Sequence, residues 1–181
     1  MAGLAVVLAG CTPLSGGRLA PPSAGDRAGP LTEGLPVLAT TAPGTLLAAA
    51  VGAGCARVEP LLSGARDSHE RPITPMDLAR LGRARVLVIN GLGLEPELPA
   101  LLRSVPHPSL RLIDSSRGVA PVPAQGRPDP HIWLDPRRAL AQVQAIRDGL
   151  IAADPACRER YRANALAAER TLLRLDRELA G

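Results

Sequence analysis

The sequence predicts an α/β fold in which a four-stranded parallel sheet with flanking helices is followed by a long C-terminal helix. From residue 35 onward, short apolar runs alternate with stretches of helical periodicity, as a parallel sheet with crossover helices requires. Near the C-terminus, apolar residues recur at steps of four and three and form one stripe: Tyr161, Ala165, Ala168, Leu172, Leu175 and Leu179. A chain of 181 residues that is 46% hydrophobic is long enough for one substantial domain.

The elements follow one another in a readable order. Apolar runs predict strands at 35–41, 57–62, 86–90 and 110–114, and helical periodicity predicts helices at 45–51, 74–84 and 96–104. Thr74 and Pro75, followed by Asp77, make a well-formed helix start. A connector with proline and glycine at 117–128 comes next. Asp135 and Pro136 then begin a helix that runs to about residue 153, and Asp154 with Pro155 repeats that start signal.

The first residues predict an export signal with a lipid anchor. Residues 4–10 are apolar but far shorter than the roughly 20 residues that span a bilayer. Cys11 follows this run directly, and Leu-Ala-Gly-Cys at 8–11 matches the lipobox of bacterial lipoproteins, which makes Cys11 the candidate lipidation site. A chance cysteine after an apolar start is the alternative. No cationic side chain precedes Arg18, so the true start of the signal peptide stays open.

Charge and composition exclude one class of partner. The chain carries 21 basic and 17 acidic residues, and every basic residue is an arginine. A nucleic-acid-binding surface needs a clustered basic stripe, often with aromatic rings for stacking. This chain has one Trp, one Tyr and no Phe, and its arginines alternate with acids along the predicted helices, so we expect no nucleic-acid partner.

Two cysteines, Cys55 and Cys157, lie about a hundred residues apart. They can pair in an oxidising compartment, but two lone cysteines do not make a disulfide framework. We expect both side chains to act as small apolar packing groups.

Two of the three histidines lie where loops follow strands or open helices, which is where open α/β sheets bind ligands. These are His69 and His131, and each has acidic residues close by in sequence. Neutral imidazole binds Zn²⁺ and Mn²⁺, and a nearby carboxylate can orient the ring. The spacing alone is a weak signal, and surface loop histidines are the alternative. We expect His107, between two prolines, to be exposed and away from any metal.

Enzymatic motifs are not complete in this sequence. The GLGLEP segment at 91–96 resembles the GxGxxG dinucleotide fingerprint, but Pro96 replaces its third glycine. Ser115 and Ser116 lack the GxSxG context of a nucleophile. No catalytic constellation can be assembled from these motifs, so we expect no enzyme. Two residues of the histidine segment have simpler roles, with Trp133 expected as a packing anchor and Asp135 as a helix cap.

Several segments, in order, resemble one protein family. DPHIWLDP at 129–136 is similar to the DPHxWxDP segment of the cluster A-I metal-binding proteins, which are the solute-binding components of bacterial ABC transporters. NGLGLE at 90–95 is similar to their NGxGxE turn. Residues 72–81 resemble the helix after their first metal-binding histidine, and 112–118 resemble a strand with a short polar step. The similarity runs over 35–179 and covers about the first half of such a protein.

The resemblance implies two α/β lobes joined by a long helix, with a metal ion held between them. His69 matches the first ligand of the family and His131 the second, whereas the third and fourth ligands come from a second lobe that this sequence lacks. The implied organisation is a signal peptide at 1–11, a flexible tether at 12–34, an N-terminal lobe at 35–153 and the start of the inter-lobe helix at 154–181.

The implied function is extracytoplasmic capture of zinc or manganese by a lipid-anchored monomer, for delivery to an ABC transporter permease. Ser68 and Arg71 stand where the family has a proline and an aromatic residue, which weakens the match at His69. The sequence does not choose between the two metals, because the ligands that decide are absent. A lipid-anchored scaffold or a degenerate remnant without metal capture is the competing interpretation.

Overall fold

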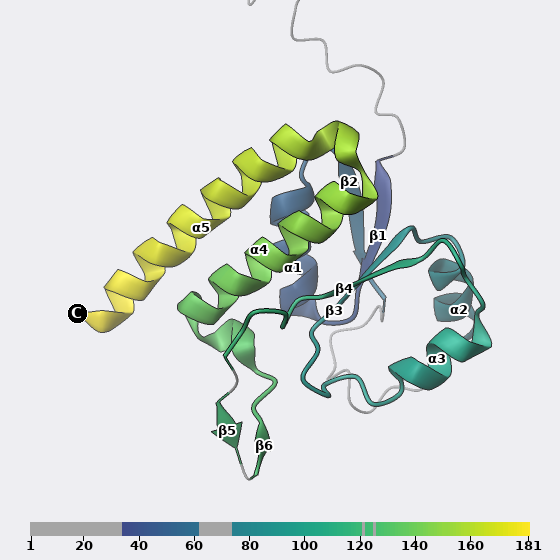
Figure 1. Ribbon diagram of the computed structural model, residues 1–181, viewed down its shortest axis with the longest axis horizontal. Coiled ribbons are helices and arrows are strands. Elements are labelled where there is room, and N and C mark those ends of the chain that lie inside the picture. The colour runs from purple at the N-terminus through teal and green to yellow at the C-terminus, as the bar shows by residue number, and fades with distance from the viewer. Residues whose placement is uncertain (1–33, 62–73, 121, 125) are drawn as a thin grey trace, which may run out of the picture. The chain divides into compact units, whose positions relative to one another are not determined.

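A four-stranded parallel sheet forms the centre of the protein (Figure 1). The computed structural model describes residues 34–61, 74–120, 122–124 and 126–181, all within the compact unit Thr32–Gly181. The strands lie in the order β2-β1-β3-β4, with β1 at Leu35–Ala39, β2 at Ala56–Pro60, β3 at Val86–Ile89 and β4 at Arg111–Asp114. All neighbouring strands in this sheet are parallel, which confirms the predicted fold class.

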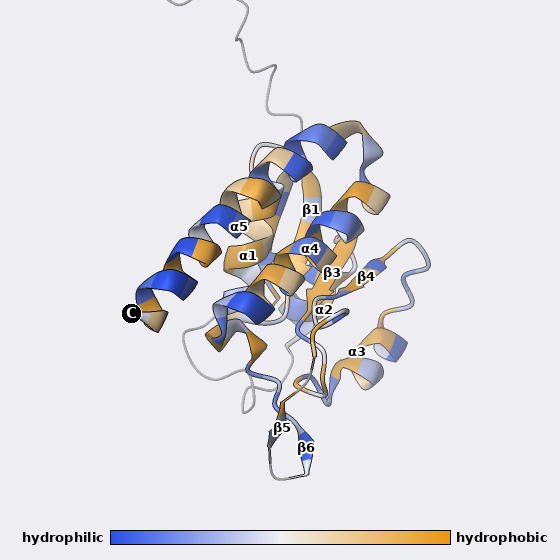
Figure 2. Ribbon diagram, turned by 60° about the vertical axis from the view of Figure 1, so that its left-hand side comes forward, coloured by the Kyte–Doolittle hydropathy of each residue, from blue (hydrophilic) through white to orange (hydrophobic). Residues whose placement is uncertain are grey.

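Helices cover both faces of the sheet. One face carries α1 (Ala42–Gly52), α4 (Pro136–Ala153) and α5 (Arg158–Ala180), and the other carries α2 (Pro75–Leu81) and α3 (Leu98–Ser104). Successive side chains of a strand point to opposite faces. Val86 and Val88 accordingly lie in the core cluster with α1, α4 and α5, whereas Leu87 lies in the cluster with α2 and α3. The two central strands, β1 and β3, are covered on both faces, which explains why they are continuous apolar runs (Figure 2).

The predicted helix starts are mostly confirmed by their caps. In α2 the Thr74 hydroxyl accepts a hydrogen bond from the Asp77 N–H, and the Asp77 carboxylate accepts one from the Thr74 N–H. The Asp135 carboxylate accepts the Arg137 N–H at 2.8 Å and caps α4 as expected. The first helix begins at Ala42, three residues before the prediction, because the Thr41 hydroxyl accepts the Gly44 N–H at 3.0 Å.

Four short elements were not predicted. The connector at 117–128 contains a two-stranded antiparallel hairpin of β5 (Pro123–Ala124) and β6 (Arg127–Pro128). Single-turn 3₁₀ helices, η1 (Ile132–Leu134) and η2 (Pro155–Cys157), precede α4 and α5. The third predicted helix starts at Leu98 and not at Pro96. Strands of two residues and single turns have no periodicity to read, so sequence patterns do not reveal them.

The apolar stripe of α5 is covered along only part of its length. Tyr161 and Ala165 are fully buried against α1 and α4. Farther along the same stripe, 42% of Leu175 and 69% of Leu179 are exposed. The stripe therefore joins the core at its beginning and leaves it toward the C-terminal end. Among the described helices, none is both long and apolar enough to cross a membrane.

The expectation that Cys55 and Cys157 are separate packing residues is wrong, because they form a disulfide with Cα atoms 6.2 Å apart. The bond joins the turn before β2 to the corner before α5. Sequence separation gave no sign of this proximity, which arises because α1 and α5 pack side by side. At the same corner the Asn164 amide donates hydrogen bonds to the carbonyl oxygens of Val51 and Ala53, at 2.9 and 3.0 Å.

Candidate metal-binding site

The strand order creates a topological switch point at the carboxyl ends of β1 and β3, which is the place where open α/β sheets form a ligand crevice. These two strands are neighbours, but the chain after β1 enters α1 on one face of the sheet and the chain after β3 leads to α3 on the other. Loops that leave neighbouring parallel strands toward opposite faces leave room for a ligand between them. Thr40 follows β1 there, and Asn90 follows β3.

The turn after β3 is closed by the side chain of Glu95. Its carboxylate accepts hydrogen bonds from the N–H groups of Asn90 and Gly91 at 2.7 and 3.1 Å, and from the Thr40 hydroxyl at 2.6 Å. Gly91 has a φ of +85°, and a Cβ atom at this position would meet Asp114 Oδ1 and Ser116 Oγ. The glycine of this motif is therefore required by backbone conformation and by space.

The segment before α4 is bound to this turn. The Asn90 amide donates a hydrogen bond to the carbonyl oxygen of Pro130 at 2.8 Å, which brings Asp129 and His131 to the carboxyl edge of β3. Ile132 is fully buried and anchors the segment in the core. The expected anchor, Trp133, is only half-buried, and its ring stands edge-on to the His131 ring at a centroid distance of 5.3 Å.

His131 is exposed and oriented by a carboxylate. Its Nδ1 lies 2.7 Å from Asp129 Oδ1, which also accepts the His131 backbone N–H at 2.9 Å. Both hydrogen bonds lower the pKa of Asp129, the backbone one more than the side-chain one. The carboxylate therefore stays charged at a lower pH than an ordinary aspartate does. A neutral imidazole that donates from Nδ1 carries its free lone pair on Nε2. About half of the His131 side chain is exposed, so Nε2 is available to a metal ion.

The described residues bring together part of the predicted site. Asp129 and His131 are adjacent, but no group of three or more histidine, cysteine or acidic residues forms among them. His69 and Cys11 both fall outside the described residues. His107 precedes β4, which places it at the opposite edge of the sheet, where it is half-buried with its Nδ1 3.2 Å from the Ser109 hydroxyl.

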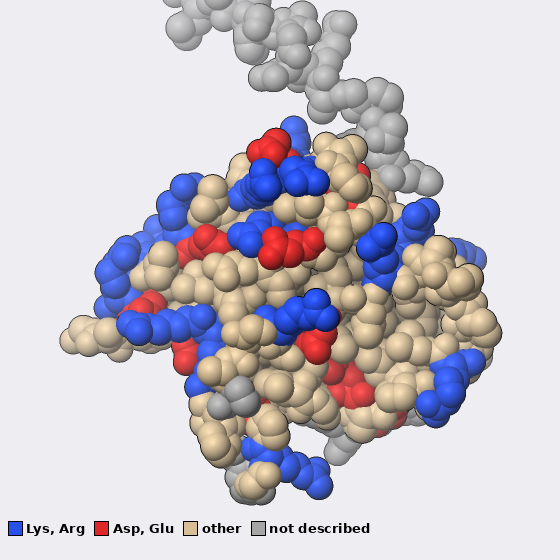
Figure 3. Space-filling model, viewed as in Figure 1, with Lys and Arg blue, Asp and Glu red and all other residues tan. Residues whose placement is uncertain are grey.

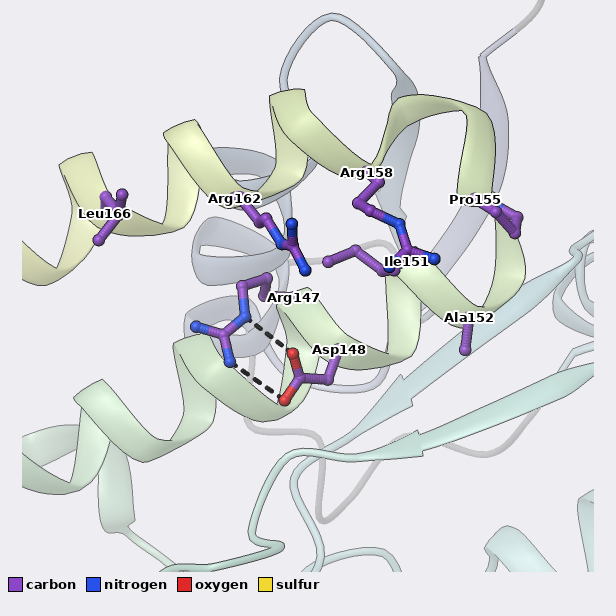
Figure 4. A pocket seen from close by; sticks show the side chains of 8 residues that line it. All are labelled: Arg147, Asp148, Ile151, Ala152, Pro155, Arg158, Arg162 and Leu166. Atoms are coloured by element: carbon purple, nitrogen blue, oxygen red, sulfur yellow. Dashed lines mark hydrogen bonds and ion pairs between the residues drawn. The ribbon is translucent and has the colours of Figure 1, made fainter.

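A groove between α4 and α5 is a second hollow, but its chemistry does not suit a cation (Figure 4). Arg147, Arg158 and Arg162 line it, and like charges repel a divalent metal. Arg147 binds Asp148 with two hydrogen bonds of 2.8 and 3.1 Å. Acids and arginines are interleaved over both helices (Figure 3), which is the pattern of a solvated surface.

The fold and the site together define a class: an α/β lobe that presents an oriented, exposed histidine at the switch point of its sheet. The family model described as "ZnuA: Zinc-uptake complex component A periplasmic" matches residues 37–181. The chain belongs to this family. Its members are metal-binding components of transport systems, as the resemblance in the motifs implied.

Individual relatives agree with this family. The manganese-binding lipoprotein MntA of Halalkalibacterium halodurans is 33% identical over 110 residues, covering 61% of this chain and 37% of the relative. The iron-binding protein YfeA of Yersinia pestis is 28% identical over 127 residues, covering 67% and 40% of the two chains. A crystal structure of ZnuA superposes with a TM-score of 0.75 and 33% identity over 81% of this chain and 58% of that one. The matched region therefore spans less than two thirds of each of these proteins.

Proposed function

We propose that this chain captures a divalent transition metal ion, zinc or manganese, outside the cytoplasm and delivers it to the permease of an ABC transporter. The observation that carries the proposal is the geometry of His131. Asp129 occupies the Nδ1 side of the ring, which leaves the Nε2 lone pair free of that contact, and about half of the side chain is exposed. A carboxylate behind a histidine raises its basicity and fixes its orientation toward a metal. The names of the relatives support the same cargo class.

We assign His69 as the second ligand of the metal, on its match to the first histidine of the family motif. Two histidines leave coordination positions to water or to ligands outside this sequence, since Zn²⁺ usually takes four ligands. Capture involves no chemical step: neutral imidazoles bind the ion, and the permease removes it. Acid weakens the binding, because a protonated imidazole has no lone pair for the metal.

The proposal also sets the cellular context of the chain. Cys11 is the lipid-anchoring residue, and the protein is a monomer tethered to the membrane by residues 12–34. The disulfide between Cys55 and Cys157 supports an extracytoplasmic location, because such bonds persist in oxidising compartments. The exposed end of the α5 stripe, at Leu175 and Leu179, is consistent with a helix that continues into a second lobe.

A metal titration of the full 181-residue chain tests the function. Zn²⁺ and Mn²⁺ are added in separate runs to the wild type and to His69→Ala, His131→Ala and His107→Ala. We expect saturable binding at one equivalent that the first two substitutions weaken. His107→Ala is the matched control, because His107 lies at the opposite edge of the sheet. Equal binding by the wild type and the His69→Ala, His131→Ala double variant would instead favour the scaffold or remnant interpretation.

A further inference from the structure

A buried amide pair connects α4 to the loop that carries His131. Asn90 and Gln142 are 2% and 1% exposed, so both side chains are inside the protein. The Gln142 Nε2 atom lies 3.4 Å from Asn90 Oδ1, and the Asn90 Nδ2 atom donates to the Pro130 carbonyl oxygen at 2.8 Å. The two amides thus form a chain of hydrogen bonds. It runs from Gln142 in the middle of α4, through Asn90 at the end of β3, to Pro130, the residue before His131.

Every polar group of Asn90 has a partner. Its backbone N–H donates to Glu95, and its carbonyl oxygen accepts from the Ser115 hydroxyl at 3.3 Å. Its side-chain oxygen faces Gln142, and the two amide protons are used by Pro130 and by the Gly91 carbonyl oxygen, at 2.8 and 3.2 Å. A buried amide with all its hydrogen bonds made has a single favourable orientation.

Gln142 sets that orientation. Its Nε2 also donates to the Ser115 hydroxyl at 3.0 Å, so the nitrogen of this amide must face Asn90 and Ser115. Its Oε1 is buried without a hydrogen-bond partner in the described part of the chain. An unpaired buried oxygen is unfavourable. The nitrogen is nevertheless required here, because the carbonyl oxygens of Pro130 and Gly91 can only accept and Asn90 therefore presents its Oδ1 to Gln142.

The loop has few other attachments. Among the described residues, the hydrogen bonds of the 129–131 segment to the rest of the lobe are the one from Asn90 and one from the Asp129 N–H to Val122 in the hairpin region. The remaining bonds are local, such as that of the His131 N–H to Asp129. Within the described part of the chain, the Asn90 bond is thus the one hydrogen bond that joins this loop to the end of a sheet strand.

We propose that Asn90 is a positioning residue of the metal site, which acts through Pro130 to hold His131 in place, with Gln142 fixing the direction of its amide. The inference rests on the proposed function, because the site it serves is the metal site. Asn90 is not itself a ligand: its oxygen faces Gln142, and its nitrogen has no lone pair to offer.

The test uses Asn90→Leu and Gln142→Met in the full chain, with Asn164→Leu as the matched control. Asn164 is also an asparagine whose amide donates to two backbone carbonyl oxygens, but it lies at the α5 corner. The first measurement is Zn²⁺ affinity by competition with a chelating dye. We expect Asn90→Leu to weaken binding roughly 10-fold or more and Gln142→Met to weaken it less, as for outer partners of metal ligands. Asn164→Leu should leave the affinity unchanged.

The second measurement needs no metal. Trp133 is the only tryptophan, so its indole signals are unambiguous in the nuclear magnetic resonance spectrum. Its ring centroid lies 5.3 Å from that of His131, which predicts a nuclear Overhauser effect between the two rings. We expect this effect to weaken in Asn90→Leu and Gln142→Met and to persist in Asn164→Leu.

The two measurements separate the two hypotheses. If the wild type binds no metal but Asn90→Leu loses the ring contact, the proposed function fails and the positioning role stands. If the wild type binds Zn²⁺, and Asn90→Leu keeps both its affinity and the ring contact, the positioning role is wrong. If Asn90→Leu does not fold, the same two measurements are made on Gln142→Met. A Zn²⁺ affinity and a ring-to-ring Overhauser effect that both equal those of the wild type would then overturn the proposal.

Discussion

The carboxylate of Glu95 accepts the backbone N–H of Asn90 at 2.7 Å, so the turn after β3 is closed by a side chain five residues along the chain. The same Oε1 atom accepts the Thr40 hydroxyl at 2.6 Å and thereby connects the ends of β1 and β3. One side chain therefore stabilises both loops of the crevice. Hydrogen bonds to a charged acceptor are stronger than those between neutral groups.

We expect Glu95→Gln to lower the free energy of unfolding by about 1 to 3 kcal/mol, because an amide cannot accept all three hydrogen bonds. Urea unfolding followed by circular dichroism measures the change. Glu97→Gln is the control, because Glu97 is exposed and its side chain makes no capping hydrogen bond to α3. Equal midpoints for the two variants would contradict the role assigned to Glu95.

Gly91 and Gly93 allow a paired prediction, because both have positive φ angles, of +85° and +79°. An alanine at position 93 meets open space, so we expect only the backbone cost of about 1 to 2 kcal/mol. An alanine at position 91 also collides with Asp114 and Ser116, and we expect a loss of roughly 2 to 5 kcal/mol in total. Urea midpoints compare the two. If alanine lowers the free energy of unfolding as much at position 93 as at position 91, the predicted collision with Asp114 and Ser116 would be wrong.

Removal of the disulfide should destabilise the lobe. We expect the Cys55→Ser, Cys157→Ser double variant to lose about 3 to 5 kcal/mol of unfolding free energy, because the bond closes a loop with a sequence separation of 102 residues. Unfolding is followed in urea without reductant. Cys11→Ser is the matched control and should unfold like the wild type, since Cys11 is expected to carry a lipid and not to pair. A reductant should shift the wild type but not the double variant.

Tyr161 should titrate at unusually high pH. Burial, followed by a hydrogen bond from its hydroxyl to Asp154 at 3.0 Å, raises the pKa of this phenol above its ordinary value of about 10. The folded state then holds the proton more tightly than the unfolded state. The associated stability is complete below about pH 10 and is lost as the pH rises above it.

The phenolate absorbance of the folded chain measures this titration directly, because Tyr161 is the only tyrosine. Its midpoint should lie above that of the urea-unfolded chain. Tyr161→Phe keeps most of the packing and should abolish the signal, at a cost of about 1 kcal/mol for the lost hydrogen bond. Coincident midpoints in the folded and unfolded chains would show that the hydroxyl is not buried.

The sequence predicted those parts of the fold that depend on neighbouring residues. The strands and the caps at Thr74 and Asp135 follow from apolar runs and from side chains that reach the next turn. The early start of α1 was missed, although Thr41 followed by Pro43 is such a local signal. The pairing of Cys55 with Cys157 and the contact of Asn90 with Gln142 depend on segments 102 and 52 residues apart. No local pattern encodes these contacts.

The candidate site divides in the same way. His131 and its acidic neighbour were visible in one short segment, and the structure shows the hydrogen bond between them. The place of that segment at the crevice depends on Asn90, whose role follows from strand order and not from spacing. The pairing of His69 with His131 stays a prediction, because residue 69 lies outside the described part of the chain.

The helix α5 is attached to the rest of the lobe at both its first and its later turns. The disulfide, the Asn164 amide and the buried ring of Tyr161 hold the first two turns. Farther along, Glu169 pairs with Arg147 of α4, and Asp176 accepts from Arg137 at 3.1 Å. A helix of 23 residues is roughly 34 Å long, and such rods bend little. It is therefore a rod supported at several points, and a force applied at Leu179 passes to the start of α4 through Asp176 and Arg137 before it reaches the Cys55 corner.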